Sequence, residues 1–199
     1  MLKKIPLKQR NKRDKVIKHA RKVFRYYGYK KTTMDDIAKE MRMGKSSLYY
    51  YFESKTEIYN AVVLYEAILY RNMVMASINE NHSPYDKLKS YVLNRMQTND
   101  VLSNFHQALK DPKLRNLEFV ERLNTLYDKE EFRLFSNILK SGVEAGYFEI
   151  PDIDDAAVGI VTAMRGLEAT IIPNINGIQI ESRIDNILKI ILYGIVKRR

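Results

Sequence analysis

The chain has 199 residues, of which 45% are hydrophobic, and it contains no cysteine. This length supports one or two domains with a real core. The lack of cysteine excludes a disulfide framework and thiolate chemistry, and it fits a reducing cytoplasm. The N-terminal stretch "MLKKIPLKQRNKRDK" has no apolar segment of the kind that a signal peptide needs. We therefore expect a cytoplasmic protein.

The basic charge is concentrated in the first third of the chain. Residues 1–60 contain 17 Lys+Arg and 6 Asp+Glu, a net charge of +11, whereas residues 61–199 contain 17 and 18, a net charge of −1. A basic segment joined to a neutral one indicates a polyanion-binding head on a body with another task. Nucleic acid is the first candidate partner and an anionic membrane surface the second, with a merely solvated basic face as the alternative to both.

Apolar residues recur at three and four positions along the whole chain, which predicts helices. The first helix is expected at about 11–27, with Gly28 as a left-handed C-cap. The stretch "TTMDDIAKEM" predicts a second helix, in which Thr33 is the N-cap and Asp36 completes a variant capping box. A short third helix is expected in "KSSLYYYF", residues 45–52.

The remaining pattern is helical as well. Ser54 with Glu57 makes a capping box for a fourth helix that ends near residue 78. Further helices are expected at about 84–97, from 99 or 100 to 110, and at 114–145, 152–172 and 181–197. We therefore predict an all-α fold of about nine helices. It comprises an N-terminal three-helix domain, residues 1–55, and a larger helical domain, residues 56–199.

A helix, a three-residue turn and a second short helix inside a basic segment is the arrangement that places the second helix in the major groove of DNA. At 100° per residue, Leu48 and Phe52 define the buried face of the short helix, and Ser46, Ser47 and Tyr50 point outward. Tyr49 and Tyr51 fall on the flanks and should be half-buried. Small serine hydroxyls suit base edges, whereas tyrosine and lysine suit phosphate oxygens.

Three further residues of this segment could contact DNA, and one of them, Thr33, has a plainer role as well. Lys45 could reach a guanine or a phosphate. Thr33 and Lys55 could add phosphate contacts at helix N-termini, although Thr33 also serves as a cap. A hydroxyl can do both.

The stretch "TTMDDIAKEMRMGKSSLYYYFESKTEI" resembles the DNA-binding domain of the TetR family of bacterial transcriptional regulators. Its Thr-started helix, Ile-Ala pair and "K-x-[ST]-L-Y-x-Y-F" run carry the resemblance over about residues 14–63. Arg42 replaces the usual glycine of the turn, and Gly44 the usual Ser or Thr; Arg42 could add a phosphate contact or simply be solvated. The resemblance implies a helix-turn-helix DNA-binding domain at residues 1–55 and a helical regulatory domain for ligand binding and dimerisation at residues 56–199. It implies DNA contacts at Thr33, Lys45, Ser46, Ser47, Tyr49, Tyr50, Tyr51 and Lys55.

The resemblance also implies a homodimer that binds a near-palindromic operator in double-stranded DNA, as a repressor rather than an activator. The apolar faces of the last two helices agree with such an interface, the alternative being a monomer that buries both helices internally. The expected interface residues are Val158, Val161, Ile184, Ile187, Leu188, Ile191, Leu192 and Ile195.

Members of the family carry a small-molecule effector in the second domain, and its binding releases the operator. Polar residues beside apolar stripes are the candidates for such a pocket, namely Tyr91, Arg95, His106 and Tyr127, although each is also consistent with ordinary packing or a surface role. No cofactor is expected.

Two other function classes stay in view. An enzyme is disfavoured because the three histidines are scattered, cysteine is absent and no carboxylate–histidine cluster has metal-ligand spacing, so no metal site is expected. A membrane-surface module would need large apolar side chains exposed beside the basic ones. The apolar stripe of the first helix is instead needed for the three-helix core.

Overall fold

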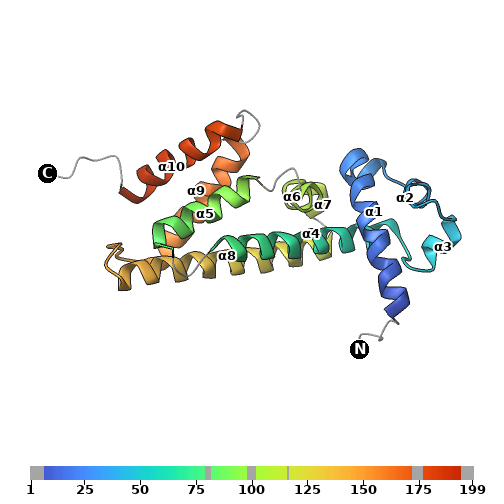
Figure 1. The fold of residues 1–199 in the computed structure, drawn as a ribbon, viewed down its shortest axis with the longest axis horizontal. Coiled ribbons are helices and arrows are strands. Elements are labelled where there is room, and N and C mark those ends of the chain that lie inside the picture. Colours follow the sequence, from blue (N-terminus) through green and yellow to red (C-terminus); the bar gives the residue numbers. More distant parts are fainter. Residues whose placement is uncertain (1–6, 79–81, 98–101, 116, 172–176, 194–199) are drawn as a thin grey trace. The chain divides into compact units, whose positions relative to one another are not determined.

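The computed structural model describes residues 7–78, 82–97, 102–115, 117–171 and 177–193. Within these ranges the chain forms ten helices and no strand, which confirms the predicted all-α class (Figure 1). No helix in the described part is long and apolar enough to cross a membrane. The helices are α1 (Leu7–Lys31), α2 (Met34–Glu40), α3 (Lys45–Tyr49), α4 (Lys55–Ser77), α5 (Pro84–Gln97), α6 (Ser103–Lys110), α7 (Pro112–Arg115), α8 (Glu118–Glu144), α9 (Ile153–Ile171) and α10 (Gly177–Tyr193).

Several helix bounds differ from the sequence-based expectation, and α1 begins at Leu7, four residues earlier than predicted. The predicted helix at 114–145 is divided into α7 and α8, because Pro112 opens a separate short helix whose first turn is capped by Asp111. The Asp111 carboxylate accepts the backbone N–H of Lys113 at 2.8 Å. The last helix begins at Gly177, four residues earlier than predicted, and its predicted end at residue 197 lies outside the described residues.

Gly28 has a positive φ of 73°, as predicted, but its ψ of 162° is extended rather than helical. The chain therefore bends at this residue, and a last helical turn comes after it before α1 ends at Lys31. Thr32 closes that turn, because its backbone N–H and its hydroxyl both donate to the Gly28 carbonyl, at 3.2 and 2.8 Å. A glycine is suited to this position because side chains disfavour positive φ.

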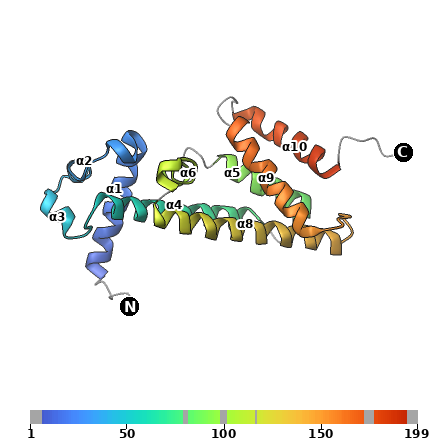
Figure 2. The same cartoon turned by 180° about the vertical axis from the view of Figure 1, so that it is seen from behind.

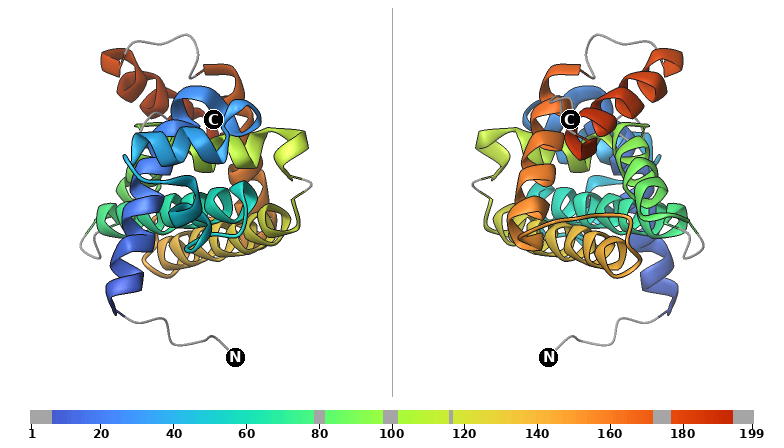
Figure 3. Two further views of the ribbon diagram at one scale, coloured as in Figure 1. Left: turned by 90° about the vertical axis from the view of Figure 1, so that its right-hand side faces the viewer. Right: turned by 90° about the vertical axis from the view of Figure 1, so that its left-hand side faces the viewer.

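The contacts within the chain define two compact units. The first unit comprises Met1–Tyr70 and Asp100–Arg122, and the second comprises Arg71–Asn99 and Leu123–Arg199. Helices α4 and α8 contribute residues to both. In the first unit α1 packs against α2 and α6 (blue and yellow-green in Figure 2), and in the second α5 packs against α10 (green and red in Figure 3).

The core of the first unit is built by the inward faces of α1, α2, α3 and α4. Phe24 and Tyr59 meet edge to face with their ring centroids 5.1 Å apart. The Tyr59 phenol has a raised pKa because it is buried and, secondarily, because it lies near the negative charge of Glu66. The fully buried apolar residues that join these helices are Val16, Ala20, Phe24, Ile37, Leu48, Ile58, Tyr59 and Val62. This core fixes the short helix α3 against the longer ones.

Candidate nucleic-acid interface

The start of α2 is held by the predicted capping box. The Thr33 hydroxyl accepts the backbone N–H of Asp36 at 3.2 Å, and the Asp36 carboxylate accepts the Thr33 N–H at 2.8 Å. The Thr33 hydroxyl also donates to this carboxylate at 2.7 Å, and these bonds lower the pKa of Asp36. Thr33 is exposed, so its capping role leaves the residue accessible to a phosphate.

The turn between α2 and α3 is a left-handed one, centred on Arg42. Arg42 has φ 52°, and among the described residues it is the one non-glycine residue with a positive φ. Its N–H donates to the Lys39 carbonyl and the N–H of Met43 to the Ala38 carbonyl, both at 3.0 Å. This pair of bonds is a Schellman motif, which normally has glycine where Arg42 stands. Arg42 is exposed, with its side chain on the same short turn that leads into α3.

Helix α3 has one buried face and one exposed face, as the helical angle predicts. Leu48 and Phe52 are fully buried, whereas Ser46 and Ser47 are exposed and Tyr50 is 68% exposed. The helix itself ends at Tyr49, and the next turn continues through bonds from the N–H groups of Tyr51 and Phe52 to the Leu48 carbonyl. Short hydroxyls and one long phenol therefore stand together on the solvent side.

The two flanking tyrosines are placed between these extremes. Tyr51 is half-buried, as predicted, whereas Tyr49 is 46% exposed and therefore more accessible than predicted. The rings of Tyr50 and Tyr51 meet edge to face with centroids 5.0 Å apart, which limits the motion of the exposed Tyr50 ring. The three consecutive tyrosines thus form an ordered set of phenols rather than one continuous hydrophobic surface.

The two lysines assigned to DNA both have partners in the protein. The Lys45 ammonium lies 2.8 Å from the Asp35 carboxylate, and this bond raises the pKa of Lys45. The Lys55 ammonium donates to the Tyr29 carbonyl at 2.9 Å and to the Lys30 carbonyl at 3.4 Å, and it lies 4.5 Å from the centre of the Tyr29 ring. Lys55 therefore stabilises the carbonyl end of α1, a role that the sequence reasoning missed.

Arg13 is a second residue that the sequence reasoning missed. It donates to the Tyr51 carbonyl at the end of the recognition segment and to Glu57 at 3.0 Å, and its guanidinium lies 3.9 Å from the Phe52 ring centre. The other Glu57 oxygen accepts the N–H of Glu53 at 2.7 Å. Arg13 thus joins α1 to the end of α3 and the start of α4. Its position three residues before buried Val16, on the apolar side of the helix, was the available signal.

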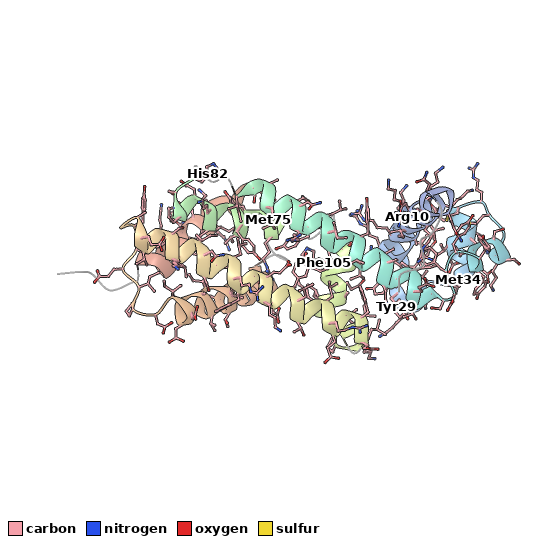
Figure 4. The ribbon with its side chains drawn as sticks, turned by 90° about the horizontal axis from the view of Figure 1, so that it is seen from below. Arg10, Tyr29, Met34, Met75, His82 and Phe105 are labelled. Carbon is pink, nitrogen blue, oxygen red and sulfur yellow. The ribbon has the colours of Figure 1, made fainter. Side chains whose placement is uncertain are left out.

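Glu66 forms a buried polar cluster at the junction of α1, α4 and α6. Its carboxylate is fully buried and accepts bonds from Arg21 Nε at 2.7 Å, Asn104 Nδ2 at 2.9 Å and the Phe105 N–H at 2.8 Å. Phe105 is labelled in Figure 4. Helix α6 has Leu102 at its N-cap with no side-chain cap, so Glu66 supplies from α4 the acceptor that the start of α6 lacks. The sequence did not indicate a buried acid here, because Glu66 lies among the apolar residues of the buried face of α4.

The residues predicted for a dimer interface are divided by the structure. Ile184, Leu188 and Val161 are buried within the second unit, and Ile187 is half-buried. Val158 is 54% exposed. The side chains of Ile191 and Leu192, and the whole of Ile195, lie outside the described residues. Ile190 on α10, which the sequence analysis did not select, is 53% exposed.

Two of the four candidate pocket residues lie together in the second unit. Tyr91 donates to the buried carboxylate of Glu131, and Arg95 pairs with the same carboxylate while also donating to the Tyr91 hydroxyl at 3.1 Å. The Tyr91 ring meets Phe135 edge to face at 4.8 Å. Tyr127, on α8 of the same unit, is half-buried.

His106 belongs to the first unit. There its ring packs against Tyr70, with centroids 5.9 Å apart, and against Phe105, at 5.3 Å. The four candidates therefore do not form one cluster within a single unit. Glu131, whose buried carboxylate joins Tyr91 and Arg95, is a candidate that the sequence did not indicate.

Comparison with known proteins agrees with this geometry at the N-terminal end. The sequence model described as "Bacterial regulatory proteins, tetR family" matches residues 16–62. The biofilm operon icaADBC HTH-type negative transcriptional regulator IcaR of Staphylococcus aureus (strain Newman) is 38% identical over 80 residues. That match covers 40% of this chain and 43% of IcaR, so less than half of the relative is represented. The relatives are named as regulators, in agreement with the expectation that the chain is not an enzyme.

Solved structures extend the likeness to most of the chain. A transcriptional regulator of the TetR/AcrR family from Thermobifida fusca has a TM-score of 0.74 at 21% identity, covering 94% of this chain and 100% of that protein. AibR, solved with isovaleryl coenzyme A and operator DNA, has a TM-score of 0.68 at 16% identity, covering 90% and 97%. Identities this low show a shared fold.

Proposed function

We propose that the chain is a sequence-specific repressor of transcription, because its residues 16–62 match the tetR-family model and its fold is that of a solved TetR/AcrR regulator along most of the chain. The observation that carries the proposal is the solvent face of α3. Ser46, Ser47 and Tyr50 stand exposed over fully buried Leu48 and Phe52. The likeness of the DNA-binding end to IcaR, a negative regulator, favours repression over activation.

The roles of the contacting residues depend on their size and charge. Ser46 and Ser47 are short enough to let α3 approach base edges, and Tyr49, Tyr50 and Tyr51 present hydroxyls to phosphates. Arg42 and Thr33 add phosphate contacts at the turn and at the start of α2. Lys45 would exchange Asp35 for DNA, and Lys55 has three ammonium protons, of which two are used by carbonyls.

Selection of bound sequences from a pool of random duplexes tests the proposal. A repressor of this kind should enrich a defined sequence, and Tyr50→Ala should weaken binding to it by about 1–3 kcal/mol. Tyr147→Ala is the matched control, because Tyr147 is 64% exposed in the second unit, remote in sequence from α3. A pool that yields no preferred sequence, or a Tyr50→Ala protein that binds the enriched sequence as wild type does, would refute the proposal.

The protein would act as a homodimer in which α9 and α10 of two copies form a four-helix interface. Exposed Val158 and Ile190 support this arrangement, since each is an apolar side chain left accessible on these two helices. An isologous dimer carries two recognition helices and would select a near-palindromic operator. In sedimentation velocity, Val158→Asp should give monomers, whereas Leu126→Asp, at an exposed position on α8, should remain dimeric. Equal dimer stability in both variants would contradict the interface.

A small molecule bound in the second domain would lower operator affinity by binding the DNA-free state more tightly. The Tyr91–Arg95–Glu131 cluster supports a polar recognition point there, because the partly buried Arg95 guanidinium can exchange its carboxylate partner for that of a ligand. Isovaleryl coenzyme A is a suitable first probe, since AibR was solved with it. Release of the enriched operator by this probe in wild type, but not in Arg95→Gln, is the expected result. Equal release from both proteins would exclude Arg95 from recognition.

A further inference from the structure

The positive charge of the N-terminal region does not lie on the predicted DNA-reading segment. Residues 32–55, which comprise α2, the turn, α3 and Lys55, contain four Lys or Arg and four Asp or Glu, a net charge of zero. Residues 1–31 contain thirteen Lys or Arg and a single acid, Asp14, a net charge of +12. The basic excess that indicated a polyanion partner therefore belongs to α1 and the residues before it.

A neutral reading segment is insufficient for tight DNA binding. Duplex affinity comes largely from neutralising phosphates with cations, which releases condensed counterions. In the reading segment, Lys45 is paired with Asp35 at 2.8 Å, and Lys55 is directed at the carbonyls of Tyr29 and Lys30. Further cations for phosphate binding are therefore expected elsewhere in the unit.

The cations of α1 fall into two groups. Arg13 and Arg21 point into the unit, where they pair with Glu57 at 3.0 Å and with Glu66 at 2.7 Å. A second group lies on the exposed side, within an arc of about 140° at 100° per residue. This basic face consists of Lys12, Lys15, Lys18, Lys22 and Arg25, all exposed and none in an ion pair with any residue of the described part.

The basic face has the dimensions of a phosphate-binding surface. From Lys12 to Arg25 it extends over about 20 Å of helix. Figure 4 shows the side chains of α1, including the exposed Arg10 near its start, ending in nitrogen (blue) outside the helix. Among the described residues of the helix, Asp14 is the one acid, so the positive field is not cancelled locally.

A duplex fits this face better than a membrane does. A membrane-surface helix inserts large apolar side chains beside its cations. In α1 the apolar Val16, Ala20, Val23 and Phe24 are buried in the core of the unit, and no large aliphatic side chain interrupts the basic face. The aromatic residue within its arc is exposed Tyr26, whose hydroxyl can itself donate to a phosphate. The basic face therefore offers cations without apolar anchors, which suits the phosphates of a duplex.

We propose that the basic face of α1 is a second, sequence-independent DNA-binding surface, which holds phosphates of a DNA duplex. The proposal rests on the DNA-binding function proposed above. It assigns separate tasks to two surfaces of one unit: α3 provides discrimination between sequences, and α1 provides most of the electrostatic affinity.

The test compares wild type with the triple variant Lys15→Gln/Lys18→Gln/Lys22→Gln. The charge-matched control is Lys129→Gln/Arg133→Gln/Lys140→Gln, which removes three exposed cations of α8. Fluorescence anisotropy with the enriched operator and with random duplex, from about 50 to 200 mM salt, gives the affinity and its salt dependence. The slope of log K against log salt should be less steep by about 2–3 for the α1 variant than for wild type. The variant should also bind both duplexes at least about tenfold more weakly. The control should match wild type.

The outcomes separate the two proposals. Failure of the wild-type protein to bind any duplex overturns the proposed function itself. An α1 variant whose DNA binding keeps the wild-type salt slope overturns the proposed second surface. If that variant also loses binding to phosphatidylglycerol vesicles, the basic face is a membrane-binding surface instead. Loss of operator preference without a change in slope would also overturn it, because the residues would then act through α3. The variant Lys15→Arg/Lys18→Arg/Lys22→Arg keeps the charge and should bind as wild type, which would attribute the loss to the removed charges.

Discussion

Replacing Glu66 by alanine should destabilise the first unit more than any exposed charge substitution. The carboxylate is fully buried and accepts three hydrogen bonds, from Arg21, Asn104 and the backbone of Phe105. Removing it leaves the Phe105 N–H at the start of α6 without an acceptor in a dry environment. It also removes the Glu66 carboxylate from the Arg21 guanidinium, whose side chain is 26% exposed.

The expected magnitude is about 3 kcal/mol. An unsatisfied buried N–H costs about 1–3 kcal/mol. Removing one partner of a buried ion pair costs about 3–5 kcal/mol when the other is fully buried. Since Arg21 can regain water through its exposed part, the lower end of this range applies. Asn104 keeps a bond to the Arg21 carbonyl at 3.1 Å, which limits the loss further.

Thermal unfolding followed by circular dichroism measures this effect. For a chain of about 150–250 residues, 1 kcal/mol shifts Tm by about 2–4 °C, so Glu66→Ala should lower Tm by roughly 6–12 °C. Glu118→Ala is the matched control, because it removes an exposed carboxylate that pairs with Arg122 on the same helix. The control should shift Tm by about 2 °C or less. Equal shifts in the two variants would refute the argument that Glu66 caps α6 from α4.

Three other substitutions probe separate features. Arg13→Ala should weaken operator binding without dissociating the dimer, and Arg13→Lys should recover only part of the affinity. A lysine ammonium cannot bind Glu57 and the Tyr51 carbonyl while also stacking on the Phe52 ring. Fluorescence anisotropy measures the operator affinity of both variants. Arg42→Gly should raise the stability by about 1 kcal/mol in thermal melts, since glycine tolerates φ 52°; an unchanged or lower Tm would contradict strain at the turn. The pKa of Asp185 is lowered by its bond to Lys189 and then by bonds to other donors on α5, so its stabilising effect is present above about pH 4 and is lost as the pH falls through the folded value. Asp185→Asn should therefore flatten the loss of stability on acidification below about pH 4, and parallel acid profiles of the two proteins would contradict this linkage.

Local features of the chain could be predicted because they depend on neighbouring residues. The capping box of Thr33 and Asp36 needs residues only three positions apart, and the structure contains it. The alternation of buried and exposed positions on α3 depends on the helical angle alone, which is why Leu48 and Tyr50 lie where they were expected. The positive φ at Arg42 could likewise be predicted, because the turn requires it.

Helix ends were less predictable where two signals compete. Pro112 favours the start of a helix, and the Asp111 carboxylate caps that start by accepting the N–H of Lys113. A short separate helix α7 therefore comes before α8, where one helix was predicted. At Gly28 the glycine was recognised, but its extended ψ depends on the closure of the next turn by Thr32. Such choices depend on which of several local conformations the surrounding core accepts.

The sequence by itself determined the helical class, the neutral body and basic head, and the exposed residues of the recognition segment, because periodicity, charge and capping are written in adjacent positions. Only the tertiary structure decided the partners of Arg13, Lys55 and Glu66, which lie 25 to 45 residues from the groups they bind. It likewise decided that Ile184 is covered by its own unit while Ile190 is not. The physical reason is that a long-range contact depends on how helices cross, and a periodic pattern specifies a helix face without specifying what will pack against it.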